Sequence, residues 1–116
     1  MGSIYLHNSR CAKSRQGMDL LKEKGIQFSV QEYLKDPLTK RDLESLYILL
    51  KKSYEVKEFT RIKEKKFKEM NLSIESFSSK SKWCKLISNN PILLERPILY
   101  DSKKAIIGRP PENLIK

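Results

Sequence analysis

The chain is poor in the residues that several common functional sites require. Its 116 residues include only four glycines, two cysteines and one histidine. No glycine-rich phosphate loop or dinucleotide-binding fingerprint is present, and four scattered glycines leave little room for one. Two cysteines and one histidine are too few for a zinc finger or for the disulfide framework of a small secreted domain. We therefore expect free thiols, no bound metal, and a reducing compartment, the cytoplasm.

Long hydrophobic runs are also absent. No apolar stretch approaches the roughly 18–20 residues that span a bilayer, and the first seven residues lack the charged and apolar regions of a secretory signal. Hydrophobic residues make up 39% of the chain and charged residues 33%, which is typical of a globular protein. At this length, residues 1–116 are expected to form a single domain with one modest core.

Acidic residues are outnumbered by basic ones, 14 to 24, and the net charge is +10. This excess favours an anionic partner, such as an oxyanion, a phosphate, a nucleic acid or an acidic protein surface. The alternative is a solvated lysine-rich face without a partner. Direct nucleic-acid binding is disfavoured, because the basic residues interleave with acidic ones and no recognition helix is apparent. Arginine is scarce, and its planar fork binds oxyanions in a way that lysine does not; it occurs only at positions 10, 15, 41, 61, 96 and 109.

The N-terminal third predicts a strand, a helix and a second strand. Residues 4–6 form a short apolar run that is typical of a buried strand. A helical pattern follows Cys11, and Gly25 is a suitable residue to end that helix. Residues 26–30 then alternate between apolar and polar side chains, which predicts a second strand.

A helical block is predicted next. Thr39 and Asp42 form a capping box in front of a helix that carries leucine and tyrosine at helical spacing. Shorter helices are expected at 64–70, with Phe67 and Met70 inward, and at 79–88.

The C-terminal part predicts a hairpin and a last helix. The apolar runs 97–100 and 105–107 flank a polar turn, and Pro110 and Pro111 open the helix. A βαβ beginning and a ββα end predict an α/β fold, with one mixed sheet covered by helices.

Cys11 is the strongest candidate for a chemically reactive residue. It follows a predicted strand and a short loop, and it directly precedes a predicted helix. The free N–H groups and the dipole of a helix start favour an anion, so a thiol at this place should react as a thiolate. Arg10 and Arg15 add positive charge, and His7 adds more if it is protonated. The alternative is a small buried cysteine that only fills space.

Ser14 completes a Cys-x-x-Ser motif, so Cys11 has no second cysteine within its own loop. A disulfide at Cys11 would have to form with an outside thiol or with Cys84. Cys84 is expected to be a core residue, and a redox partnership with Cys11 is the alternative.

Residues 7–15, His-Asn-Ser-Arg-Cys-Ala-Lys-Ser-Arg, closely resemble the active-site loop of the glutaredoxin-linked arsenate reductase family. The resemblance continues through residues 32–39, 90–98 and 107–112. It implies a thioredoxin-like fold, in which a mixed four-stranded sheet is flanked by helices. A helical insert, at about 38–90, would separate the βαβ and ββα halves. The chain looks like the compact branch of the family, which is related to the Spx proteins.

The resemblance also implies how the site works. Cys11 matches the nucleophilic cysteine, and Arg96 and Arg109 match two arginines that hold the oxyanion. Arg61 matches a third, in a segment whose sequence is much less similar; the alternative is that Arg61 is only one of the basic residues that crowd this segment. The implied activity is reduction of arsenate to arsenite, with glutathione as co-substrate and glutaredoxin as the protein that resolves the mixed disulfide, and with no bound cofactor.

Three further residues take roles from the same resemblance. His7 and Ser14 match residues that assist the thiolate, and Pro97 matches the cis-proline that faces the active-site cysteine in thioredoxin-like folds.

Two other functions stay open. Spx regulators share the fold and bind RNA polymerase instead of turning over arsenate, but they typically carry Cys-x-x-Cys where this chain has Cys-x-x-Ser. A general glutathione-dependent thiol oxidoreductase would need Cys11 but not all three of the matched arginines.

Overall fold

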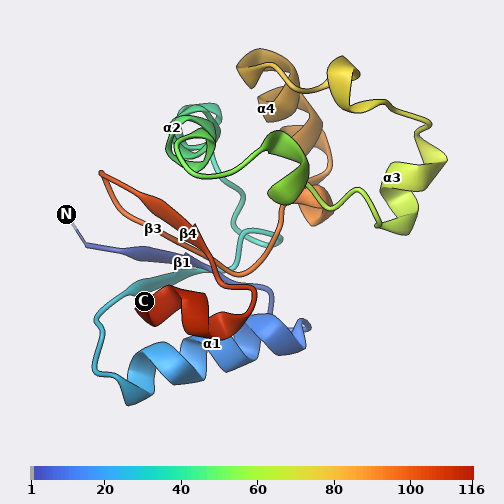
Figure 1. Cartoon of the computed structure of the whole chain (residues 1–116). Helices are drawn as coiled ribbons and strands as arrows, with labels where there is room; N and C mark the ends of the chain where they lie inside the picture. Colours follow the sequence, from blue (N-terminus) through green and yellow to red (C-terminus); the bar gives the residue numbers. More distant parts are fainter. Residues whose placement is uncertain (1) are drawn as a thin grey trace. The chain divides into compact units, whose positions relative to one another are not determined.

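The computed structural model describes residues 2–116, and they divide into two compact units (Figure 1). Unit 1 combines the two ends of the chain, Met1–Asp36 and Arg96–Lys116. Unit 2 is the block between them, Pro37–Glu95. Within residues 2–116, no helix is both long and apolar enough to cross a membrane.

Unit 1 is built on a four-stranded mixed sheet with the strand order β2-β1-β3-β4. β1 (Ile4–Leu6) pairs in parallel with β2 (Ser29–Gln31) and antiparallel with β3 (Ile98–Tyr100). β3 pairs antiparallel with β4 (Ala105–Ile107). The predicted order of elements and the mixed α/β sheet are therefore confirmed, and β1 from one end of the chain lies beside β3 from the other.

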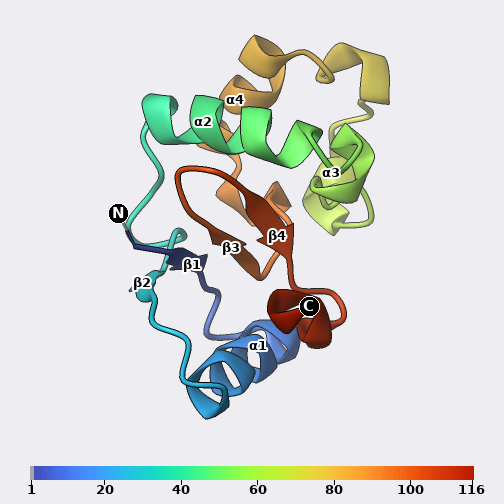
Figure 2. The same ribbon diagram turned by 60° about the vertical axis from the view of Figure 1, so that its left-hand side comes forward.

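Two helical segments lie on one face of this sheet, α1 (Ala12–Glu23) and the 3-10 helix η4 (Pro111–Ile115), and they are side by side in both ribbon views (Figure 2). Tyr5 of β1, Leu99 of β3, Leu21 of α1 and Leu114 of η4 form the buried core between them. Partly buried apolar side chains surround this core: Met18, Ile26, Phe28 and Ile106.

The end of α1 forms as its sequence predicts. Gly25 has a φ of 69°, the left-handed conformation that glycine adopts without strain. The Gly25 N–H donates to the Lys22 carbonyl at 3.0 Å, and the Ile26 N–H donates to the Leu21 carbonyl at 3.0 Å. These are the two bonds of a Schellman motif, which turns the chain back toward the sheet.

Unit 2 contains α2 (Lys40–Lys51), α3 (Lys65–Glu69) and α4 (Lys80–Asn89), with short 3-10 turns between them. The predicted capping box is present, because the Asp42 N–H donates to the Thr39 hydroxyl and the Thr39 N–H donates to the Asp42 carboxylate. α2 and α4 pack against each other.

The core of unit 2 is aromatic. Trp83 of α4 lies 5.3 Å from Phe59 and 5.6 Å from Tyr47, measured between ring centroids. Its indole N–H donates to the Thr60 hydroxyl at 2.9 Å, so the polar atom of this fully buried side chain is satisfied. Phe67, predicted to point inward, is buried against Phe77.

Three expectations differ from the structure in detail. The second strand is shorter than the alternation at 26–30 predicts, and Val30 is 48% exposed because β2 is an edge strand. Met70 is the C-cap residue of α3 and is only half-buried. The last helix is a single 3-10 segment, η4, whose first residue is Pro111.

Candidate active site

Cys11 lies where the loop after β1 enters α1. It is the N-cap residue of that helix, with extended backbone angles of −95° and 120°. Its N–H donates to the Asn8 carbonyl at 3.0 Å, and its carbonyl accepts the Arg15 N–H at 3.0 Å. The thiol is free and partly exposed. The predicted position at a helix start is therefore present, and the thiol is within reach of a reactant from solvent.

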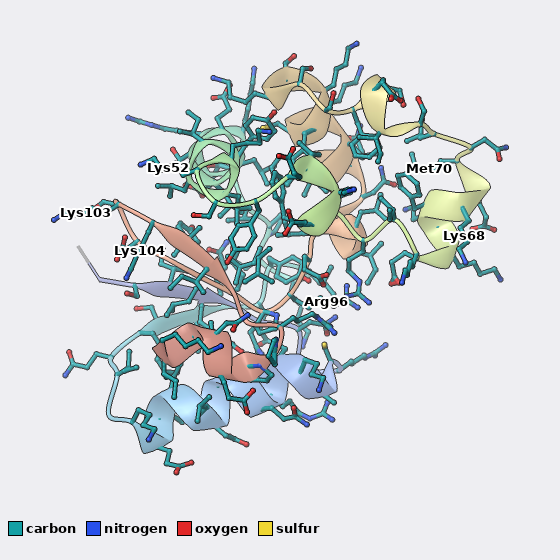
Figure 3. All side chains as sticks on the ribbon, in the orientation of Figure 1. Lys52, Lys68, Met70, Arg96, Lys103 and Lys104 are labelled. Atoms are coloured by element: carbon teal, nitrogen blue, oxygen red, sulfur yellow. The ribbon has the colours of Figure 1, made fainter. Side chains whose placement is uncertain are left out.

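Two arginines from the other end of the chain lie at this thiol. Nη2 of Arg109 donates to Sγ of Cys11 at 3.3 Å, and Nε of Arg109 donates to the Arg96 carbonyl at 2.7 Å. Arg96 is only 7% exposed, and Figure 3 shows it at the end of the sheet where α1 begins. The peptide bonds that join Arg96 to Pro97 and Arg109 to Pro110 are both cis. The structure thus brings Cys11, Arg96 and Arg109 together within unit 1.

These neighbours change the acidity of the thiol. Burial by itself raises the pKa of Cys11, because it penalises the charged form. The backbone N–H of Ser14 and the guanidinium groups of Arg96 and Arg109 act in the opposite direction and outweigh it. The pKa of Cys11 consequently lies below its ordinary value, which favours the nucleophilic thiolate near neutral pH.

Ser14, in the first turn of α1, is fully buried and is held by several contacts. Its Oγ lies 2.7 Å from Nδ1 of His7 and accepts the Asn8 N–H at 3.1 Å. Its carbonyl accepts the hydroxyl of Tyr5 at 2.6 Å. Both residues that the resemblance links to the thiolate, His7 and Ser14, therefore contact each other directly.

His7 does not supply the positive charge considered above. Burial lowers the pKa of His7, and although Glu32 opposes this effect, Arg15 and Lys22 add to it. The imidazole is thus neutral at pH 7, and its contact with Ser14 is a hydrogen bond between two uncharged groups. The cationic groups that act on Cys11 are Arg96 and Arg109.

Asn8 is a site residue that the sequence reasoning missed. It is 7% exposed, and its side-chain Oδ1 accepts the Arg10 N–H at 3.0 Å while its carbonyl accepts the Cys11 N–H. An asparagine side chain often accepts a backbone N–H two residues on and so forms a turn. The position of Asn8 shortly before the predicted helix was therefore the available signal for this turn. Asn8 fixes the turn that presents Cys11.

Arg61 belongs to unit 2 and has carboxylate partners there. Its Nη1 donates to Oε1 of Glu95 at 2.7 Å, and its Nε lies 3.9 Å from Oε1 of Glu64. The Arg61 N–H donates to the Leu93 carbonyl at 2.7 Å. These contacts join the segment of Arg61 to the segment that contains Leu93 and Glu95, which is a structural role for Arg61.

Cys84 is buried in α4, 4% exposed, as expected for a core residue. Burial raises the pKa of Cys84, and the nearby carboxylate of Glu44 raises it further. The pKa values of the two cysteines are therefore shifted in opposite directions, and only Cys11 has the surroundings of a reactive thiol.

The chain is similar to known proteins over nearly its whole length. The ArsC family model matches residues 6–116. Arsenate reductase of Haemophilus influenzae is 36% identical over 116 residues, which cover 100% of this chain and 98% of the relative. Arsenate reductase from Vibrio cholerae has a solved structure with a TM-score of 0.86 and 36% identity, covering 99% of this chain and 96% of that one.

A regulatory protein is also among the relatives. Regulatory protein MgsR of Bacillus subtilis is 32% identical over 91% of this chain and 82% of its own length. Proteins named as arsenate reductases and a protein named as a regulator are thus both similar to this chain in sequence. Because the family model covers nearly the whole sequence and a solved arsenate reductase has a similar fold, the chain belongs to the ArsC family.

Proposed function

We propose that this chain reduces arsenate to arsenite, with the Cys11 thiolate as the nucleophile. The observation that carries the proposal is the hydrogen bond from Nη2 of Arg109 to Sγ of Cys11, which joins residues 98 positions apart in the sequence. A guanidinium held against a thiol at a helix start stabilises a thiolate and attracts an oxyanion to the same place. The arsenate reductases among the relatives support the choice of substrate.

The oxyanion would be held by Arg96, Arg109 and the first turn of α1. Arsenate is a tetrahedral anion, and a planar guanidinium can donate to two of its oxygens at once. Donors that are already in place need no reorganisation when charge develops during the reaction. Because Arg109 is anchored by its Nε on the Arg96 carbonyl, its remaining N–H groups have a fixed direction.

The proposed reaction has two chemical steps. The Cys11 thiolate attacks arsenic, an S–As bond forms, and one arsenate oxygen takes up protons and leaves as water. A glutathione thiolate then attacks the Cys11 sulfur and breaks the S–As bond. The bonding electron pair stays on arsenic, which leaves as arsenite, reduced by two electrons. The two sulfurs are oxidised to a mixed disulfide between Cys11 and glutathione.

Regeneration of the thiol would need a partner, because the active loop contains no second cysteine. We propose glutaredoxin, which would resolve the mixed disulfide by thiol–disulfide exchange. The reaction uses glutathione as a co-substrate and no bound cofactor, and it suits the reducing conditions of the cytoplasm.

The remaining matched residues have narrower proposed roles. His7 and Ser14 would position the first turn of α1, and Pro97 would face the Cys11 thiol. We keep Arg61 as a proposed third oxyanion ligand on the strength of the resemblance alone, since its contacts in unit 2 give it a structural role as well.

The test is a coupled assay in which arsenate-dependent oxidation of NADPH is followed through glutathione reductase. Wild-type protein should turn over only when glutathione and glutaredoxin are both present, and Cys11→Ser should be inactive. Cys84→Ser is the matched control and should stay active, because Cys84 is buried in unit 2. Turnover by Cys11→Ser would remove the proposed nucleophile, and turnover without glutaredoxin would remove the proposed partner.

A second candidate is a regulatory protein that binds RNA polymerase. It is favoured by the relationship to Regulatory protein MgsR and disfavoured by Ser14, where the Spx regulators typically have cysteine. Recovery of RNA polymerase with a purified chain that has no arsenate turnover would support this alternative.

A further inference from the structure

The buried hydroxyl of Tyr5 has a contact that the proposed chemistry does not yet use. Tyr5 lies in the inner strand β1 and is completely buried, and its hydroxyl donates to the Ser14 carbonyl in the first turn of α1 at 2.6 Å. A strand residue thus holds the helix turn that contains Cys11. Its ring also lies 5.9 Å from the ring of His7, which contacts the Ser14 hydroxyl.

Gly17 provides an independent observation at the same place. It is buried in the middle of α1, where glycine costs about 0.5–1 kcal/mol relative to alanine. A Cβ on Gly17 would collide with the hydroxyl of Tyr5 and would lie 2.9 Å from Cδ1 of Leu114. The missing side chain therefore leaves the space through which the Tyr5 hydroxyl reaches the helix.

We propose that Tyr5 is a positioning residue for the nucleophile: its hydroxyl fixes the first turn of α1 so that the Ser14 N–H stays directed at Sγ of Cys11 and stabilises the thiolate. The chain of contacts is short. Tyr5 holds the Ser14 carbonyl, His7 and Asn8 hold the Ser14 hydroxyl, and the N–H of this immobilised residue acts on the thiol.

The hydroxyl is a permanent donor in this arrangement. Burial raises the pKa of Tyr5 above its ordinary value, so the proton stays on the oxygen throughout the range in which Cys11 ionises. The charged groups that act on Cys11 directly are Arg96 and Arg109, and Tyr5 is proposed to act only through Ser14. The inference rests on the part of the proposed function that makes the Cys11 thiolate reactive; it does not depend on arsenate being the substrate.

The experiment measures how fast iodoacetamide alkylates Cys11 as a function of pH, in a Cys84→Ser background that leaves one thiol. Tyr5→Phe removes only the hydroxyl. Tyr5→Phe deletes the bond to the Ser14 carbonyl but only weakens the interaction of the Ser14 N–H with Sγ of Cys11. We therefore expect alkylation at pH 7 to slow by about three- to fivefold, less than for full loss of a hydrogen bond to a charged group. The midpoint of the pH profile should move upward, while the rate at high pH should match that of the parent.

Tyr47→Phe is the matched control. It also removes a tyrosine hydroxyl that donates to a backbone carbonyl, that of Ser78, but it lies in unit 2. Both variants should lose some stability, and only Tyr5→Phe should shift the pH profile. A Tyr5→Phe profile that overlays the parent would overturn the proposal, as would an equal shift in Tyr47→Phe.

Gly17→Ala tests the same contact from the helix side and decides the question if Tyr5→Phe does not fold. Crowding the Tyr5 hydroxyl should also slow alkylation at pH 7, and an unchanged rate in Gly17→Ala would by itself overturn the proposal. In the double variant the two effects should be less than additive, because both act on one hydrogen bond. Full additivity would contradict the proposal. A parent protein whose own profile has an ordinary midpoint would instead count against the proposed nucleophile.

Discussion

Replacement of Arg109 by alanine tests the electrostatic core of the site. The variant loses the donor that lies 3.3 Å from Sγ of Cys11. A hydrogen bond to a charged group contributes about 1.5–3 kcal/mol, and because Arg109 is partly exposed we use the lower end of that range. Since about 1.4 kcal/mol corresponds to a factor of ten, alkylation of Cys11 near neutral pH should slow by about tenfold.

The same variant should lose more in the arsenate reaction than in alkylation. Removal of one donor to a developing oxyanion lowers kcat by about 10²–10³-fold, and iodoacetamide is uncharged and needs no such donor. The arsenate turnover of Arg109→Lys should lie between that of Arg109→Ala and that of the parent. An ammonium keeps the charge but cannot contact both the Arg96 carbonyl and Sγ of Cys11 as the guanidinium does.

Arg15→Ala is the control for the change in net charge. Arg15 is also in unit 1, but its guanidinium donates to the Ser9 carbonyl and not to the thiol. This variant should alkylate at the parent rate. Equal alkylation rates for Arg109→Ala and the parent would refute the reasoning, and so would full rescue of arsenate turnover by Arg109→Lys.

Three other predictions concern stability. A Cβ at Gly108 would lie 2.8 Å from Cγ of Pro97, so Gly108→Ala should lower the free energy of unfolding by about 1–3 kcal/mol, measured in urea; an unchanged midpoint would show that the contact relaxes freely. The pKa of His7 is lowered on folding, so the unfolded chain binds a proton at His7 more readily than the folded chain does. The free energy of unfolding should therefore fall as the pH drops below about 6.5. His7→Asn should reduce the dependence of the free energy of unfolding on pH between about pH 7 and 5. Arg61→Ala leaves Glu95 without its 2.7 Å partner and should cost about 1–2 kcal/mol, below the range for fully buried pairs because both side chains are partly exposed; double-mutant cycles with Glu95→Gln check the coupling.

The elements of this chain could largely be predicted from local sequence. The capping box at Thr39 and the glycine at position 25 depend on backbone geometry within a few residues, and both form as expected. The length of β2 could not be predicted, because alternation reports which side chains are apolar and not where strand pairing ends. Val30 continues the apolar pattern but lies on an edge strand and is exposed.

The candidate site was only partly accessible from sequence. The helix start at Cys11 follows from local pattern, but no periodicity connects it to Arg109, 98 positions away; only the family resemblance did so. The sequence indicates only that Tyr5 belongs to an apolar strand, because its hydroxyl bond to Ser14 depends on tertiary packing. A glycine within a helical pattern, Gly17, was the one available signal of that close approach.

The sheet order has a consequence for the chain during its folding. β1 is flanked by β2 from its own half and by β3 from the far end, and the arginine that contacts Cys11 follows β4. Before β3 and β4 have folded beside β1, Cys11 lacks the guanidinium groups of Arg96 and Arg109, and the remaining cations near it are those of its own segment. The reactivity of Cys11 toward electrophiles therefore rises only when the strands from the two halves of unit 1 have paired.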